Sequence, residues 1–181
     1  MGRVPRVDVG NQIYHVINRA NGRQTIFHKK EDHQHFEALL EEAQERSGMR
    51  ILAYVLMPNH WHLLLYPKID GDISTFMQWL TLTHTQQYHA RTRTIGYGHL
   101  YQGRYKSFLI EKDSYYLTVI KYIERNPVRA KLSRTVEGWR WGSGSDILLG
   151  PQSRNSCLPI LPLCSRETTM RGLIPPNLLT S

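Results

Sequence analysis

Two histidines, His60 and His62, stand at the start of an apolar segment of the chain. Another apolar segment of strand length precedes them, and Pro58-Asn59 between the two segments is typical of a turn. We therefore predict two antiparallel strands joined by a tight turn. Residues i and i+2 of a strand point to the same face, so both imidazoles leave the sheet side by side while Trp61 faces the other way. Two neighbouring imidazoles are half of a metal site.

A predicted helix over residues 114–125 carries a second set of reactive side chains. Its apolar residues form one stripe of a 3.6-residue period, and these are Tyr116, Val119, Ile120 and Ile123. Tyr122 lies off this stripe, on a flank where Asn126 follows it one turn later. A phenol can attack a phosphate if a cation withdraws charge from that phosphate and holds it in line. Two imidazoles and one amide oxygen would suit Mg²⁺ or Mn²⁺ and leave positions open for phosphate oxygens and water.

Each of these residues also has a simpler interpretation. The histidine pair could be strand histidines satisfied by hydrogen bonds, and Tyr122 could be a half-buried aromatic beside the core. Asn126 precedes a proline, which is ordinary chemistry for ending a helix. Tyr115 is a rival nucleophile on the same flank, but it lacks an amide four residues later. The remaining histidines receive no role.

The apolar periodicity predicts the element order β-α-β-β-α-β-α. The economical fold for this order is α+β, with a mostly antiparallel sheet, a split β-α-β arrangement and helices on one face of the sheet. We predict one domain over residues 1–141 and a Gly/Ser/Pro-rich extension over 142–181, which we expect to be poorly ordered. The predicted elements are strands at 12–19, 51–55, from residue 60 onward and 104–110, with helices at 31–46, 73–90 and 114–125.

The charge balance indicates a polyanionic partner. The chain has 23 Lys and Arg against 15 Asp and Glu, a net charge of +8, together with 10 Tyr and 4 Trp that could stack on unpaired bases. A plain basic surface with core aromatics is the alternative. We name Asn18, Arg19, Arg104 and Lys106 as candidates for phosphate or hairpin contacts.

Composition also bears on location. No apolar run reaches the roughly 18 residues of a membrane span, and no signal peptide is evident, so we predict no membrane partner. Cys157 and Cys164 lack the spacing of a zinc site or a disulfide framework. We expect a cytoplasmic protein, associated with the nucleoid if it binds DNA.

Three blocks of the sequence, in the same order, resemble the REP-associated tyrosine transposases, a single-tyrosine branch of the HUH single-strand endonucleases. The resemblance covers about residues 10–141, and His60-Trp61-His62 matches the His-hydrophobe-His motif. The blocks are Met57-Pro58-Asn59-His60-Trp61-His62, Gln102-Gly103-Arg104-Tyr105-Lys106-Ser107 and Tyr122-Ile123-Glu124-Arg125-Asn126-Pro127-Val128-Arg129-Ala130.

The resemblance implies a ferredoxin-like core with the histidine pair on a central strand and a C-terminal catalytic helix. It implies His60, His62 and Asn126 as metal ligands and Tyr122 as the nucleophile. Such enzymes nick single-stranded DNA near palindromic hairpins, leaving a 5′-phosphotyrosine link and a free 3′-OH. A monomer is the expectation, with a homodimer that exchanges tyrosine helices as the alternative. The tail after Gly142 has no counterpart in the pattern.

Three functional hypotheses follow from these observations. The leading one is a metal-dependent single-strand DNA endonuclease and strand transferase, a transposase working through Tyr122. The second is a domesticated, non-catalytic module that binds hairpin DNA or RNA. The third is a metal-dependent phosphodiesterase that uses an activated water and forms no tyrosine adduct.

Overall fold

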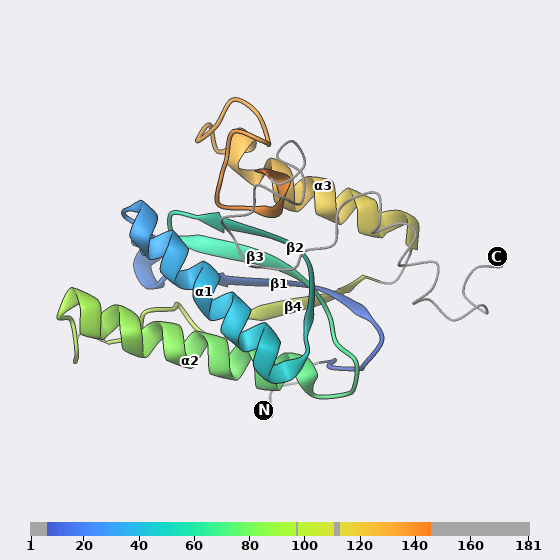
Figure 1. Cartoon of the computed structure of the whole chain (residues 1–181), viewed down its shortest axis with the longest axis horizontal. Helices are drawn as coiled ribbons and strands as arrows, with labels where there is room; N and C mark the ends of the chain where they lie inside the picture. Colours follow the sequence, from blue (N-terminus) through green and yellow to red (C-terminus); the bar gives the residue numbers. More distant parts are fainter. Residues whose placement is uncertain (1–6, 97, 111–112, 146–181) are drawn as a thin grey trace.

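The computed structural model describes residues 7–96, 98–110 and 113–145 of the chain (Figure 1). Its elements follow the predicted β-α-β-β-α-β-α order, with two short 3₁₀ turns added. They are β1 (Ile13–Arg19), η1 (Asn21–Arg23), α1 (Lys30–Ser47), β2 (Arg50–Met57), β3 (His60–Tyr66), α2 (Asp72–Thr92), β4 (Lys106–Ile110), α3 (Asp113–Arg129) and η2 (Ser143–Ser145).

The four strands form one sheet in the order β2-β3-β1-β4, and every neighbouring pair is antiparallel. β1 and β2 are therefore parallel to each other and are joined through α1, with β3 inserted between them. This is the predicted split β-α-β arrangement of a ferredoxin-like core. β3, which carries the histidine pair, is a central strand, as the resemblance implied.

The sheet lies between two layers of helices (Figure 1). α1 and α2 pack together on one face, and α3 covers the other. Side-chain alternation along β3 divides its residues between two cores: Trp61 and Leu63 pack beneath α1 and α2, whereas Leu64 packs against α3. The prediction of helices on one face therefore holds for α1 and α2, with α3 as the separate C-terminal helix.

The C-terminal ends of α1 and α3 are formed in different ways. Gly48 ends α1 in the left-handed conformation, with φ of 66°, which a residue without a Cβ adopts at no steric cost. α3 instead continues to Arg129, so the prediction that Asn126-Pro127 ends the helix was wrong. Pro127 has no N–H for the carbonyl of Ile123, but Nδ2 of Asn126 lies 3.3 Å from that oxygen and donates to it. The side chain thus replaces a backbone bond, and the helix carries on.

The first residues after the predicted domain boundary pack on β2. Gly142 pairs with Val55, and the hydroxyl of Ser143 accepts from the Tyr54 N–H at 3.2 Å and donates to Glu124 of α3 at 3.1 Å. The predicted extension from residue 146 onward, including both cysteines, lies outside the described residues. Among the residues described, no helix is long and apolar enough to cross a membrane.

A buried hydrogen-bond chain in the larger core ties three aromatic side chains together. Nε1–H of Trp61 donates to the hydroxyl of Tyr101 at 3.1 Å, and this hydroxyl lies 2.6 Å from Nδ1 of His84, to which it can donate in turn. Burial raises the pKa of Tyr101 and lowers the pKa of His84 to about 3. Both groups are therefore neutral at pH 7.

Acid should destabilise the fold through His84. Its folded pKa of about 3 lies below the unfolded value of 6.5, so the unfolded state gains protons first as the pH falls below 6.5. Between pH 7 and pH 5 this one group should lower the free energy of unfolding by about 2 kcal/mol. Urea titrations at both pH values should show that His84→Gln, which still accepts from Tyr101, loses correspondingly less stability. An equal loss in both proteins would contradict this assignment.

Candidate active site

The two histidines of β3 lie on the sheet face that α3 covers. His60 and His62 point to this face, whereas Trp61, between them, is buried in the core beneath α1 and α2. In the neighbouring strand β1, Ile17 stands opposite His62 and Arg19 opposite His60. The structure thus confirms the arrangement that the His-x-His spacing predicted, with both imidazoles on one face of a strand.

The ring of His60 is held in one tautomer by its neighbour. Its Nδ1 lies 2.7 Å from Oδ1 of Asn59. The orientation of that amide is set by its Nδ2, which donates to the carbonyl of Arg23 at 3.0 Å. Because an amide oxygen only accepts hydrogen bonds, the hydrogen must sit on Nδ1 of His60. Nε2 of His60 therefore carries a lone pair.

His62 is bound at one nitrogen and lacks a partner at the other. Its Nδ1 lies 2.9 Å from Nε2 of His15 on β1, and the two rings are nearly parallel, 16° apart, with centroids separated by 5.1 Å. Nε2 of His62 is buried and has no hydrogen-bond partner among the described residues. A buried nitrogen of this kind is open to a water or an ion.

All three imidazoles of this face are neutral at physiological pH. Burial lowers the pKa of His15 to about 4. Burial, with a smaller contribution from the charge of Arg19, lowers the pKa of His60 to about 4. Burial lowers the pKa of His62 to about 3, helped by repulsion from His15, His60 and Arg19. Neutral imidazoles offer lone pairs to a cation, so no proton has to leave before one binds.

Tyr122 of α3 stands beside these rings. Its ring lies edge-on to His62 at 5.9 Å and to His15 at 6.0 Å between centroids. The apolar stripe of α3 is buried as predicted, whereas Tyr122, on the flank, is 40% exposed. The rival Tyr115 is 56% exposed and makes no ring contact with the histidines among the described residues. The guanidinium of Arg129 lies over the Tyr122 ring, 5.4 Å from its centroid.

Asn126 lies one turn beyond Tyr122 on the same flank of α3. Its Nδ2 donates to the carbonyls of Tyr122 at 2.8 Å and Ile123 at 3.3 Å. These bonds fix the amide so that Oδ1 points away from the helix backbone. The side chain therefore has a structural function that the sequence did not reveal.

The residues present fit a divalent cation. Two neutral imidazoles offer Nε2, and that of His62 is buried with no partner among the described residues. The amide oxygen of Asn126 is a hard donor on the flank of α3 that carries Tyr122. Within the described part of the chain, no three His, Cys, Asp or Glu side chains cluster as a metal-binding group. A cation at this site would thus complete its shell with the amide, water or phosphate oxygens.

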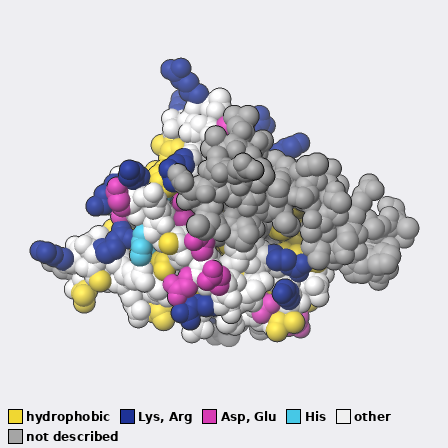
Figure 2. Space-filling view, viewed as in Figure 1, with side chains coloured by type: hydrophobic (Ala, Val, Ile, Leu, Met, Phe, Trp, Pro, Cys, Tyr) yellow, Lys and Arg dark blue, Asp and Glu magenta, His cyan; other side chains and the backbone are white. Residues whose placement is uncertain are grey.

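The four predicted nucleic-acid contacts divide between the two faces of the sheet. Arg19 and Lys106 share the histidine face, since they lie opposite His60 and Ile17 in register. Arg104 is exposed and lines a groove on the opposite face. Asn18 borders that groove but is only 6% exposed, and its Oδ1 accepts from the Arg19 N–H at 2.9 Å. Basic and acidic side chains are interspersed on the surface facing the viewer in Figure 2, so the surplus charge forms no single patch there.

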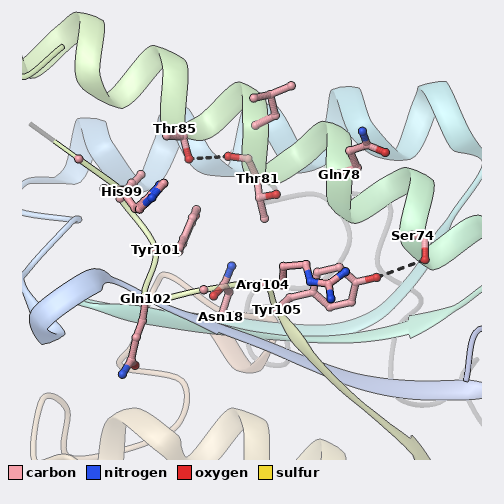
Figure 3. Close-up of a pocket in the computed structure, with 14 residues that line it drawn as sticks. Asn18, Ser74, Gln78, Thr81, Thr85, His99, Tyr101, Gln102, Arg104 and Tyr105 are labelled. Carbon is pink, nitrogen blue, oxygen red and sulfur yellow. Dashed lines mark hydrogen bonds between the residues drawn. The ribbon is translucent and has the colours of Figure 1, made fainter. Parts of the chain in front are cut away.

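The groove runs between α2 and the loop before β4 and has a volume of about 860 Å³ (Figure 3). Its α2 wall presents hydroxyl and amide groups, including Gln78 and Thr81, and its loop wall presents Tyr101 and Tyr105. A groove of this size and chemistry could hold a nucleotide. It lies across the sheet from Tyr122, so the structure does not bring Arg104 and the histidine pair into one site.

His15 is the site residue that the sequence did not reveal. It lies within a strand that was correctly predicted, but its proximity to His62 depends on the pairing of β1 with β3. With this pairing known, alternation would have placed His15, Ile17 and Arg19 on the histidine face.

Comparison with known proteins identifies the class. The model of the family "Transposase IS200 like" matches residues 8–126, more than half of the chain. The chain therefore belongs to the IS200-like transposase family, whose members are DNA-processing enzymes. No match was found among curated proteins.

Two solved structures are similar to this chain. A REP-associated tyrosine transposase bound to a REP hairpin is 18% identical, covers 97% of this chain and 89% of its own, and has a TM-score of 0.65. A candidate transposase from Deinococcus radiodurans is 20% identical over 68% of this chain and 97% of its own, with a TM-score of 0.49. The first of these confirms the predicted fold.

Proposed function

We propose that this transposase is a metal-dependent single-strand DNA nickase and strand transferase that works through Tyr122. The observation that carries the proposal is the contact of Tyr122 with His62, whose Nε2 is buried and has no partner in the part of the chain that the structure describes. A nucleophile next to an orphaned ligand nitrogen is the arrangement needed for attack on a cation-bound phosphate.

The reaction conserves the number of phosphodiester bonds. The Tyr122 hydroxyl oxygen forms a bond to phosphorus while the bond to the 3′-oxygen breaks. The phenol proton is lost to solvent, and the departing 3′-oxygen takes up a proton. The products are a 5′-phosphotyrosine and a free 3′-OH, which can attack the link and reverse or transfer it. The phosphotyrosine bond conserves the energy of the broken phosphodiester bond, so rejoining requires no nucleotide cofactor.

Each side chain has a separate task in this proposal. Mg²⁺ or Mn²⁺, held by His60, His62 and Asn126, would withdraw charge from the scissile phosphate. Arg19 and Lys106 lie on the same face and would attract the DNA backbone. The scissile strand must be unpaired to reach Tyr122, which lies beside the sheet on α3. The hairpin bound to the similar solved structure supports a palindromic hairpin as the neighbouring element.

The site supports a working monomer. Tyr122 contacts His62 within a single chain, so one copy holds both the nucleophile and the proposed ligands. Exchange of α3 between two copies is therefore not required to complete the site. Sedimentation of the protein with hairpin DNA should give one protein per DNA.

The proposal can be tested by determining which end of the cleaved DNA becomes linked to the protein. A single-stranded hairpin substrate labelled at either the 5′ or the 3′ end is incubated with protein and Mn²⁺ and run on a denaturing gel. A 5′-phosphotyrosine keeps the 3′ portion attached, so only the 3′ label should shift with the protein, and chelator should abolish the shift. Cleavage without a linked band would favour an activated water. Native-gel binding without cleavage under any metal would favour a binding module.

The basic side chains should contribute through salt-dependent binding. Lys106→Ala should weaken hairpin binding and reduce the slope of log K against log salt by about 0.7–0.9, the value for one lost phosphate contact. Lys30→Ala, at the exposed start of α1, is the matched control and should leave the slope unchanged. Equal slopes for all three proteins would show that Lys106 does not contact phosphate.

A further inference from the structure

The contact between His15 and His62 joins two strands at the floor of the site. The two side chains come from β1 and β3, 47 residues apart, and both are buried, at 9% and 4% exposure. The two ring nitrogens lie 2.9 Å apart, so one hydrogen must lie between them, because two hydrogens would clash and none would leave two lone pairs facing each other. Either His62 donates from Nδ1 or His15 donates from Nε2.

The two arrangements differ in what they leave at the far side of His62. If His15 donated, a neutral His62 would carry its hydrogen on Nε2, and a buried N–H would lack an acceptor among the described residues. Buried N–H groups without a partner are rare because they cost a full desolvation penalty. If His62 donates from Nδ1, its Nε2 carries a lone pair that a cation can satisfy.

His60 provides an internal precedent. Its tautomer is settled, since the Asn59 amide oxygen can only accept from Nδ1. Its Nε2 is thus the available nitrogen. If His62 carries its hydrogen on Nδ1, it also presents Nε2 to a cation. The two rings are then equivalent ligands, and in each the Nδ1–H donates to an acceptor on the side away from the cation.

We propose that His15 is a positioning residue for His62. Its Nε2 accepts the Nδ1–H of His62, which fixes the tautomer and the ring plane and directs the Nε2 lone pair toward the proposed cation. Metal-binding histidines are generally oriented in this way by an acceptor behind the ring. His15 is itself held in place by the edge of Tyr122, 6.0 Å away, and by the ring of Phe108, 6.2 Å away between centroids. This role rests on the proposed function, since it assumes a cation at His60 and His62.

The first measurement needs no metal. Long-range ¹H–¹⁵N spectra of the metal-free protein report which ring nitrogen of each histidine carries hydrogen, and the signals missing in His62→Gln assign that ring. We expect hydrogen on Nδ1 of His62. Hydrogen on Nε2 of His62 would overturn the proposal.

The second measurement compares two replacements of His15. His15→Gln places an amide oxygen where it can still accept, whereas His15→Leu keeps apolar volume and removes the acceptor. Mn²⁺ titrations followed by electron paramagnetic resonance should give a Kd about 10–100-fold weaker for His15→Leu. For His15→Gln the change should be less than about threefold, with the Nδ1–H tautomer retained. A purely structural role would not make the Kd depend on whether residue 15 can accept a hydrogen bond.

The outcomes separate this proposal from the proposed function. If the unchanged protein binds Mn²⁺ and His15→Leu binds it equally well, the role of His15 is overturned while the metal site stands. If the unchanged protein binds no Mn²⁺, the metal site of the proposed function is wrong and the positioning role falls with it. Should His15→Leu fail to fold, the tautomer in the unchanged protein and the Kd of His15→Gln still decide the question.

Discussion

Tyr122→Phe should abolish formation of the protein–DNA adduct, lowering its rate by at least about 10³-fold, because the variant has no oxygen to attack phosphorus. The ring remains, so its edge contacts with His15 and His62 are kept. Tyr122 is 40% exposed, and removing its hydroxyl should cost little stability. Hairpin affinity should change by less than about twofold. Single-turnover labelling of a 3′-labelled hairpin measures the adduct, and a filter-binding assay measures the affinity.

Tyr115→Phe is the matched control for this experiment. It removes a phenol from the same helix, two turns earlier, at a residue that is 56% exposed. We expect the adduct to form at the normal rate. The reverse pattern, with loss in Tyr115→Phe and activity in Tyr122→Phe, would mean that the nucleophile has been misassigned.

His62→Gln should weaken Mn²⁺ binding by at least about 100-fold and lower adduct formation in parallel. The variant removes the buried Nε2, which has no partner within residues 7–96, 98–110 and 113–145 and is the nitrogen we assign to the cation. Loss of adduct at low Mn²⁺ should be partly restored at high Mn²⁺, since binding and not the nucleophile is impaired. Titration of adduct yield against Mn²⁺ concentration measures this shift.

His99→Gln serves as its control. His99 is an exposed histidine at the groove on the opposite face of the sheet. Its replacement should leave the Mn²⁺ dependence unchanged. If His62→Gln and His99→Gln gave the same Mn²⁺ dependence as the unchanged protein, the histidine pair would not be the metal site.

Much of the fold could be predicted from local patterns. The period-2 alternation after Pro58-Asn59 placed His60 and His62 on one face, and the apolar stripe of α3 placed Tyr122 on an exposed flank. Both depend on residues close in sequence, where geometry is set by the element itself. The order of the strands in the sheet could not be predicted from local patterns, because the neighbours of a strand depend on contacts between distant segments of the chain.

The errors and omissions came from tertiary context. Asn126-Pro127 was expected to end α3, but the amide of Asn126 supplies the hydrogen bond that proline cannot. His15 received no role because its contact with His62 exists only once β1 pairs with β3. Arg104 and Lys106 are near in sequence but lie on different faces of the sheet. Arg104 lies in the loop before β4 and lines the groove, whereas Lys106 is the first residue of β4 and lies on the histidine face.

The most direct test of the account is to identify the amino acid that carries DNA. A hairpin substrate is reacted with Mn²⁺, the adduct is digested with nuclease and protease, and the modified peptide is sequenced by mass spectrometry. We predict a 5′-phosphonucleotide on the hydroxyl of Tyr122. A nucleotide on Tyr115 or on any other residue, or cleaved hairpin without a modified peptide, would contradict catalysis through Tyr122.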